Sequence, residues 1–397
     1  MRLFVTTAAI VLIASGANAQ SVSVHNPGPE RDDAVIDLPV LPDAKVRSAR
    51  IGETVYPVQY LMLDGQPPKL RLVAPLKADE TVTVNLSPDP APDQARRVLV
   101  TLNIQEGGHL QGDPKNGGAI TGGVFHLRDS FTSPKDHFIH DGLIAFEGIG
   151  WESDKVAYRL YLDQRNVTDI FGKYGTDMIF PNVGHGFDDY QYPVAWGGDI
   201  FKVGPSLGVG GIGLLRGGKA TQTGPSTITG KVIANGPVTA IAGVDADAIG
   251  GGKGSLHATY AITAGSVITE VTVHADQVTE PLVTGLTLHP SDQQIVPPTQ
   301  EDWTYIAVWG PQEHGPDPVG WAVFYRPDSV TGAPVDDGQT LFVQFKSPTD
   351  ASYRFGARWT QEGKDAVPGV RDLAGFKAWL DLTVAELDRP LAYNLQK

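Results

Sequence analysis

Short runs of alternating apolar and polar residues, separated by glycine and proline, recur along the whole chain. Clear examples are residues 81–86, 156–163, 267–275 and 340–346. A period of two is typical of a strand that turns one face to a core and the other away from it. The 46 glycines and 30 prolines lie mostly between such runs and supply turns. The pattern therefore predicts an all-β chain.

One segment near the C-terminus has the period of a helix instead. Asp372 is suited to cap its first turn, and Pro390 is placed to end it. Its apolar residues are spaced along one face: Leu373, Phe376, Leu380, Val384 and Leu387. We expect this face to pack against a sheet, because an apolar stripe on a helix is normally buried.

The spacing of turn residues also predicts two β domains. Residues 88–94 are rich in proline and aspartate, as linkers often are. We therefore expect a small β-sandwich over residues 20–93 and a large β-sandwich over residues 94–397. The second segment, with the helix at its end, is long enough for a large two-sheet sandwich and is the expected catalytic domain.

The first 19 residues have the pattern of a secretory signal peptide. Arg2 precedes an apolar run over residues 3–14, and the small residues Ala17 and Ala19 mark a cleavage site. A membrane anchor is the weaker interpretation, because a spanning helix needs about 20 apolar residues. The chain has no cysteine, so no disulfide is expected. These features predict a periplasmic protein without a membrane span.

Charge makes several kinds of partner improbable. The chain has 31 basic and 45 acidic residues, a net charge of -14. Its basic residues form no cluster, so neither nucleic acid nor an anionic lipid surface is an expected partner.

A glycine-rich stretch resembles two nucleotide-binding motifs but meets the requirements of neither. Gly208, Gly210 and Gly213 have the G-x-G-x-x-G spacing, yet a segment rich in glycine and threonine follows in place of a helix. Lys219 is followed by Ala220, where a phosphate-binding loop needs a hydroxyl. We therefore predict no nucleotide site and interpret the glycines as positions of close backbone approach.

Groups that move protons or hold charge gather in residues 136–173, 184–202 and 309–321. In the first segment Arg159, Tyr161 and Asp163 share one face of an expected strand. An arginine there is suited to bidentate contact with a carboxylate, although a surface pair between Arg159 and Asp163 is the plainer alternative. The His-x-x-His spacing that ends at His140 is weak evidence for a metal, and we predict none.

Four blocks of the chain stand out as motifs: VHNPGPERDDAVIDLP at residues 24–39, HDGLIAFEGIGWESDKVAYRLYLDQRNVTDIFGK at 140–173, WGGDIFKVGPSLGVGGIGL at 196–214 and FGARW at 355–359. Together they resemble an exported bacterial family known as domain of unknown function 4861. The family is associated with polysaccharide degradation. The resemblance implies a large β-sandwich like those of sugar mutarotases and polysaccharide lyases, preceded by a small β domain.

The leading hypothesis is a lyase that cleaves uronate-containing oligosaccharides by β-elimination. This reaction needs a donor that holds the carboxylate, a base and an acid. The candidates for these roles are Arg159 or Lys202, His140 or His185, and Tyr190 or Tyr192, respectively. Further candidates for substrate binding are Glu147, Tyr161, Asp163, Trp196, Asp199, Trp309 and His314.

Two other classes of function remain open from the sequence. A mutarotase, epimerase or hydrolase would pair a histidine with Glu147 or Asp199 for proton transfer. A noncatalytic glycan-binding protein would use the aromatic residues and would not need the histidines. The expected partner is an oligosaccharide in each case, and no residue pattern identifies a cofactor.

Overall fold

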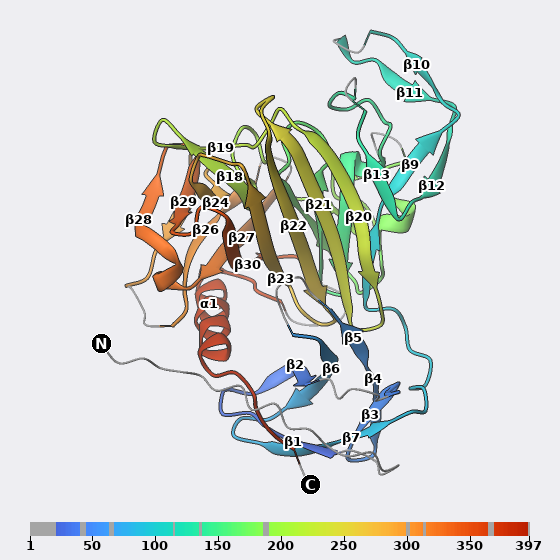
Figure 1. Cartoon of the computed structure of the whole chain (residues 1–397), viewed down its shortest axis with the longest axis vertical. Coiled ribbons are helices and arrows are strands. Elements are labelled where there is room, and N and C mark those ends of the chain that lie inside the picture. The colour runs from blue at the N-terminus through green and yellow to red at the C-terminus, as the bar shows by residue number, and fades with distance from the viewer. Residues whose placement is uncertain are drawn as a thin grey trace.

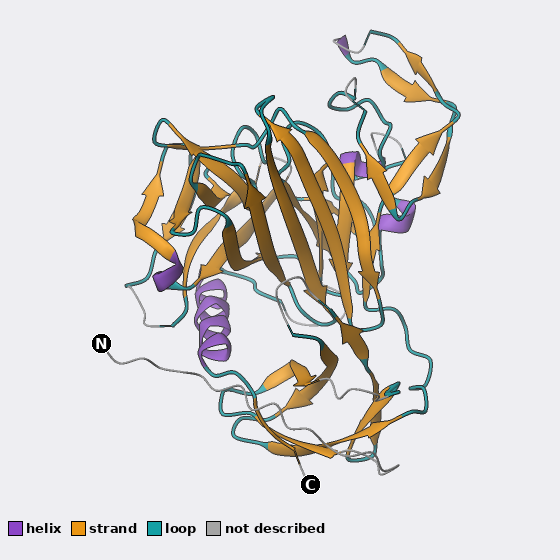
Figure 2. Ribbon diagram, viewed as in Figure 1, coloured by secondary structure: helices purple, strands orange, loops and turns teal. Residues whose placement is uncertain are grey.

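The chain is built almost entirely of antiparallel strands, with one α-helix near its C-terminus (Figures 1 and 2). The computed structural model describes residues 21–39, 45–62, 67–113, 116–134, 137–185, 190–298, 302–312, 315–363 and 369–395. The expected leader (residues 1–19) and His314 lie outside these ranges. Among the described residues, no helix combines the length and apolar character that a membrane span requires.

The first strands form two small sheets around an apolar cluster of their own. The five-stranded sheet has the order β31 (Ala392–Leu395), β1 (Ser21–His25), β7 (Thr81–Ser87), β3 (Ser48–Ile51) and β4 (Thr54–Pro57). The three-stranded sheet has the order β2 (Arg31–Pro39), β6 (Lys69–Leu76) and β5 (Gln59–Leu61). The last strand of the chain therefore pairs with the first (Figure 1), which the sequence pattern did not indicate.

The larger part of the chain is a two-layer sandwich. One layer is a nine-stranded sheet in the order β13 (Ser130–Thr132), β20 (Thr227–Asn235), β21 (Thr239–Ile249), β22 (Gly254–Thr263), β23 (Ile268–Asp276), β30 (Asp350–Trp359), β27 (Gly315–Tyr325), β26 (Thr304–Gln312) and β25 (Gln293–Ile295). Two five-stranded sheets form the other layer, and an isolated bridge between Thr168 and Gly208 connects them. One apolar core contains side chains from all three sheets, so the all-β sandwich prediction is confirmed.

The first five-stranded sheet carries most of the predicted site residues. Its order is β17 (Gly197–Asp199), β16 (Thr168–Lys173), β15 (Val156–Tyr161), β14 (Gly148–Ser153) and β8 (Val98–Thr101). The second has the order β19 (Lys219–Thr221), β18 (Val209–Arg216), β24 (Leu282–Thr287), β29 (Thr340–Phe345) and β28 (Val330–Asp336).

The remaining elements are short. Two two-stranded ladders form an arm at one end of the molecule (Figure 1): β9 (Asn103–Glu106) with β12 (Val124–Leu127), and β10 (His109–Gln111) with β11 (Ala119–Thr121). Single 3-10 turns are η2 (Ala145–Glu147), η3 (Phe180–Asn182) and η4 (Pro327–Ser329).

The predicted helix is present as α1 (Leu373–Asp388). The Asp372 side chain accepts a hydrogen bond from the backbone N of Gly375 at 2.8 Å, as expected of an N-cap. Phe376, Leu380 and Val384 are buried against side chains of β26 and β27. The helix therefore covers part of the nine-stranded sheet on the face opposite the sandwich core.

The glycine-rich stretch is a strand, β18, rather than a nucleotide-binding turn. Gly208 and Gly210 have positive φ angles of 69° and 64°. A Cβ atom on Gly210 would lie 2.6 Å from the ring of Phe355, and one on Gly208 would overlap the carbonyl of Thr168. The prediction that these glycines permit close backbone approach is confirmed.

A buried arginine joins the small sheets to the sandwich. Arg71 on β6 binds both oxygens of Asp37, with Nε–Oδ1 and Nη2–Oδ2 distances of 2.7 and 2.9 Å. Its Nη1 atom also donates to Glu270 at 3.1 Å and Thr263 at 2.9 Å, both on the nine-stranded sheet. The contact between the two parts therefore depends on a satisfied ionic network rather than on apolar packing alone.

We predict that Arg71→Met lowers the free energy of unfolding by about 3 kcal/mol, because two partly buried carboxylates lose their partner. Chemical denaturation measures the change. Arg50→Met is the control, since Arg50 is exposed on β3. Equal effects of the two substitutions would contradict the structural role of Arg71.

Candidate active site

Strand β15 divides its side chains between the sandwich core and a second, polar layer. Val156, Tyr158 and Leu160 lie in the core, and Arg159 lies on the opposite face. Tyr161 contacts the core with its ring and directs its hydroxyl to Arg159 and Asp169. The predicted alternation is confirmed. The second face is not open, however, because Arg159 is only 3% exposed. Loops before β14 and between β16 and β17 cover it and contribute a cluster of aromatic side chains.

Arg159 is the centre of a buried ionic cluster. Its Nη2 atom lies 2.7 Å from Oδ2 of Asp169 and 2.8 Å from Oδ2 of Asp199. Nη1 donates to the carbonyl of Phe146 at 3.1 Å, and the hydroxyl of Tyr161 donates to Asp169 at 2.6 Å. The guanidinium thus uses its donors within the protein. The alternative of a surface pair between Arg159 and Asp163 was wrong.

Asp163 is held by Arg165 instead. The Nε atom of Arg165 lies 2.9 Å from Oδ1 and 3.0 Å from Oδ2 of Asp163. The same guanidinium lies 3.5 Å from the ring centroid of Tyr161 and 3.5 Å from Oε1 of Glu147. Arg165 is 17% exposed, so it lies nearer the surface than Arg159.

His140 and Glu147 form a pair at the surface of this cluster. The imidazole Nδ1 lies 2.8 Å from Oε1 of Glu147, and the backbone N of His140 donates to the same oxygen at 3.0 Å. The imidazole is 55% exposed, whereas the carboxylate is 10% exposed. A buried carboxylate that orients an accessible imidazole is a common arrangement in histidines that transfer protons.

The backbone around this pair is strained. His140, Phe146 and Glu147 have φ angles of 69°, 41° and 61°, which side chains other than glycine rarely adopt. The turn is held because Phe146 N donates to the carbonyl of Gly184 at 3.3 Å and Leu162 N donates to the carbonyl of Glu147 at 3.1 Å. Residues in such conformations tend to cluster at functional sites.

The surroundings shift the pKa values of two carboxyl groups in opposite directions. Burial alone would raise the pKa of Glu147, but the hydrogen bond from His140 and the charges of Arg159 and Arg165 lower it to about 2. Burial and the neighbouring Asp169 hold the pKa of Asp199 well above its ordinary value. Divergent pKa values in one cluster are typical of sites that transfer protons.

Tyrosine and histidine side chains from the loop between β16 and β17 border the cluster. The Tyr190 ring centroid lies 5.5 Å from the guanidinium carbon of Arg159, and burial raises the pKa of Tyr190 to about 12. His185 follows Gly184, stacks on Phe125 with centroids 4.7 Å apart, and has its Nε2 atom 2.8 Å from Nδ2 of Asn103.

Two further aromatic residues lie toward the outside of the same loop. Tyr192 is exposed, and Trp196 is half-buried with its ring stacked 6.4 Å from Phe171. The exposed ring of Tyr192 offers a flat face to a sugar.

Two predicted residues lie elsewhere. Trp309 on β26 packs against Phe376 of α1, with ring centroids 5.3 Å apart. Lys202 is exposed, and its described backbone contacts are with Gln312 and His289. The structure thus brings His140, Glu147, Arg159, Tyr161, Tyr190 and Asp199 together, with Asp163 and His185 beside them.

The sequence analysis missed Asp169 and Arg165. The alternation of Asp169, Phe171 and Lys173 placed Asp169 on one face of a strand, but only the structure shows that it lies opposite Arg159 in the register of β15 and β16. Arg165 follows the end of β15 in a turn, where no periodic signal places a side chain.

The two histidines of the His-x-x-His pattern bind separate carboxylates. Nδ1 of His137 lies 2.6 Å from Oδ2 of Asp141, whereas His140 contacts Glu147. Within the described part of the chain, no three residues of the usual ligand types are placed to hold a metal ion.

The fold and the site define a class of protein: a β-sandwich in which an accessible histidine lies over a buried ionic cluster. A family model described as "Domain of unknown function (DUF4861)" matches residues 37–392. The chain therefore belongs to the DUF4861 family, as the resemblance of its four sequence blocks indicated. A comparison with curated proteins found no match.

Two solved structures resemble the chain at low similarity. One is an alpha-mannosidase from Enterococcus faecalis V583, with a TM-score of 0.40 and 9% identity over 96% of this chain and 46% of the other. The second is a protein of glycosyl hydrolase family 38 from Enterococcus faecalis, with a TM-score of 0.39 and 9% identity over 96% and 47%. The chain thus spans about half of either structure. Both TM-scores are below 0.5, so these likenesses define neither a shared fold nor a shared reaction.

The low pKa of Glu147 predicts a pH-dependent contribution to stability. A carboxyl whose pKa falls from 4.5 to about 2 on folding stabilises the protein above pH 4.5, and this contribution is lost as the pH falls toward 2. We expect the difference in unfolding free energy between the wild type and Glu147→Gln to shrink by about 3 kcal/mol over that range.

Denaturant unfolding at a series of pH values measures this difference. Glu53→Gln is the control, since Glu53 is exposed in the turn between β3 and β4. A constant difference for Glu147→Gln at every pH would show that the carboxylate is not held by the surrounding cations.

Proposed function

We propose that this protein is a periplasmic carbohydrate-active enzyme in which His140 transfers a proton of the substrate, and that its reaction is β-elimination on uronate-containing oligosaccharides. The observation that carries the proposal is the 2.8 Å contact between the accessible His140 imidazole and the buried Glu147 carboxylate. Such a pair fixes the tautomer and the direction of a general base.

The proposed reaction assigns one proton transfer to each of two side chains. With Nδ1–H directed at Glu147, the unprotonated Nε2 of His140 takes the proton from the carbon beside the substrate carboxylate. The electron pair of that bond forms a C=C bond, and the C–O bond on the next carbon breaks. Tyr192, which is 65% exposed, gives its phenolic proton to the leaving oxygen, whereas Tyr190 is only 2% exposed and lies too deep to meet a substrate.

The substrate carboxylate is assigned to Arg165 rather than to Arg159. Arg159 is occupied by Asp169, Asp199 and the carbonyl of Phe146, so it acts as a positioning residue. Arg165 lies closer to the surface and 3.5 Å from Glu147, which supports a role next to the reacting carbon.

A second candidate is mutarotation or epimerisation of a neutral sugar. The contact of Arg165 with both carboxylate oxygens of Asp163 favours this second candidate. The carboxylate of a uronate would have to displace Asp163 from Arg165, whereas a neutral sugar would not. In this reaction the His140–Glu147 pair exchanges a proton with a sugar hydroxyl or ring carbon, and no carboxylate site is needed.

We predict that pectic, alginate-like or glucuronan oligosaccharides develop the ultraviolet absorbance of a new C=C bond when incubated with the protein. His140→Asn is expected to lower kcat by about 10²–10⁴-fold, the usual contribution of a general base. His257→Asn is the matched control, since His257 is 51% exposed and its Nδ1 lies 3.0 Å from Asp245 in the nine-stranded sheet.

The outcomes separate the hypotheses. Absence of absorbance with all three classes of substrate rejects the lyase, and polarimetry with neutral sugars then tests the second candidate. Full turnover in His140→Asn would show that the reaction occurs elsewhere. Binding without turnover in any assay would favour a noncatalytic glycan-binding protein.

A further inference from the structure

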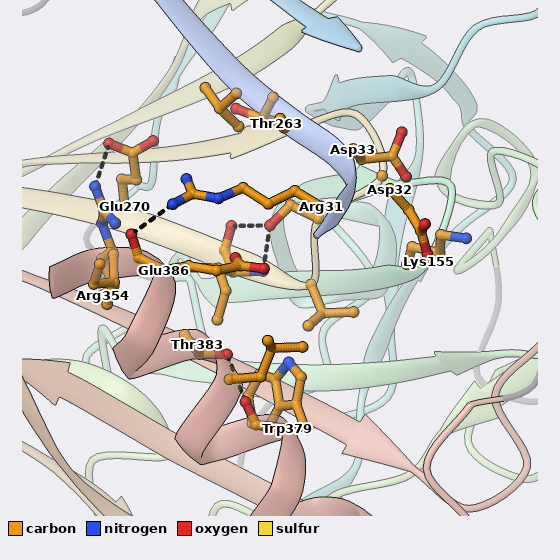
Figure 3. A pocket seen from close by; sticks show the side chains of 18 of the residues that line it. Arg31, Asp32, Asp33, Lys155, Thr263, Glu270, Arg354, Trp379, Thr383 and Glu386 are labelled. Carbon is orange, nitrogen blue, oxygen red and sulfur yellow. Dashed lines mark hydrogen bonds and ion pairs between the residues drawn. The ribbon is translucent and has the colours of Figure 1, made fainter. Parts of the chain in front are cut away.

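A cleft of about 710 Å³ lies between the small N-terminal sheets, the near end of the sandwich and helix α1 (Figure 3). Arg31 and Asp32 line it from β2, Arg354 from β30, and Trp379 and Glu386 from α1. Sites for small molecules commonly have volumes of about 300–1,000 Å³. The cleft is therefore large enough for a short segment of a glycan.

The cleft is separate from the site at His140. Lys155, which lines the cleft, immediately precedes β15, whereas Tyr161 of the ionic cluster ends that strand. A strand advances about 3.3 Å per residue, so the two ends of β15 lie about 17 Å apart. One ligand site at each end of the strand is thus possible without overlap.

Several charged side chains that line the cleft already bind other side chains and hold the walls of the cleft in place. Arg71 is satisfied by Asp37 and Glu270, as described above. Nε of Arg358 lies 2.7 Å from Oε1 of Glu362, and the guanidinium lies over the ring of Trp379. These groups fix the walls rather than offering contacts to a ligand.

Other polar side chains in the cleft have hydrogen-bond donors or acceptors that no described residue satisfies. Among the described residues, no carboxylate lies within 4.0 Å of Nζ of Lys155, and no donor lies within hydrogen-bond distance of the Glu386 carboxyl. Burial raises the pKa of Glu386. Arg354 approaches Glu270 at 3.6 Å, which is longer than a hydrogen bond.

These spare groups lie on opposite sides of the cleft. Figure 3 shows Lys155 beside Asp32 on one side, and Arg354 and Glu386 across from them; the neighbouring Asp33 is bound by Arg97 at 2.9 Å. Each side thus offers both a cation and a carboxyl. A ligand that spans the cleft meets donors and acceptors at both ends.

The balance of charge indicates the class of ligand. Six basic and seven acidic side chains line the cleft, in a protein of net charge -14. An anionic ligand gains no net attraction there. Hydroxyl groups both donate and accept hydrogen bonds, so they match walls of mixed sign. Trp303 and Trp379 also line the cleft and add apolar surface, with the guanidinium groups of Arg354 and Arg358 lying over their rings.

We propose that this cleft is a second carbohydrate site, which binds a neutral, polyhydroxylated segment of a glycan. It does not depend on the reaction proposed for His140. Because its walls come from the N-terminal sheets, the nine-stranded sheet and α1, a bound glycan also strengthens the contact between these parts.

Isothermal titration calorimetry with manno-, cello- and galacto-oligosaccharides tests the proposal, with an oligogalacturonate as the acidic comparison. The full-length His140→Asn variant serves as the parent protein, so that turnover does not consume the ligand. We expect at least one neutral series to bind more tightly than the acidic one. Adding Lys155→Met or Glu386→Gln is expected to raise Kd by about tenfold, the effect of losing one or two hydrogen bonds. Lys253→Met is the control, since Lys253 is exposed in the turn between β21 and β22.

Hydrogen exchange provides a second readout that needs no cleft variant. Bound oligosaccharide should slow exchange of amides in β2 and α1 while leaving β18 and β24, which do not line the cleft, unaffected. Absence of binding by all neutral series, tighter binding of the acidic one, or an unchanged Kd in both cleft variants would overturn the proposal.

The proposal for the cleft and the proposal for the reaction at His140 can be rejected separately. If the cleft proposal fails, the proposed reaction still stands as long as the cleft variants turn over short uronates. If the proposed reaction fails, the cleft proposal still stands as long as His140→Asn binds neutral glycans.

Discussion

A single buried guanidinium organises the polar side of the sandwich. Removing the charge of Arg159 from water costs several kcal/mol, which Asp169 and Asp199 offset with short, charge-assisted hydrogen bonds. Through these contacts Arg159 connects β15, β16 and β17, and through the carbonyl of Phe146 it holds the turn that precedes β14. Four segments of the chain therefore meet at one side chain.

The orientation of the His140–Glu147 pair follows from this arrangement. Glu147 adjoins Phe146 in a turn whose φ angles are unfavourable, and such a turn persists only where its surroundings determine it. The hydrogen bond to the Phe146 carbonyl and the charges near Glu147 provide that constraint. The ionic cluster thus fixes the direction in which the imidazole is presented, although Arg159 itself lies too deep to meet a substrate.

The sequence predicted features whose cause is local. Alternation located β15 and assigned Arg159 to the face opposite the core, and the cap at Asp372 located the start of α1. Features that depend on the path of distant loops were not accessible. The burial of Arg159, the packing of Trp309 against α1 and the pairing of β31 with β1 all arise from segments far apart in the chain. Alternation shows which side chains share a face, but it does not show whether another layer covers that face.

The β14–β15 hairpin links the two regions of interest. Its Tyr161 end borders the ionic cluster, and the turn at Lys155 borders the cleft under the N-terminal sheets. The hairpin is buried along its whole length, so it forms a rigid wall common to both regions. The proposed reaction site and the proposed binding cleft therefore lie at opposite ends of one hairpin.

The most direct test of the central claim is amide hydrogen exchange in Arg159→Lys, which keeps the charge but loses the planar fork of donors. If Arg159 organises the site, exchange becomes faster in residues 140–147 and 190–199, while β21 and β22 exchange as in the wild type. Unchanged exchange in those two segments would contradict the account, because the turn and loop would then hold their positions without the guanidinium.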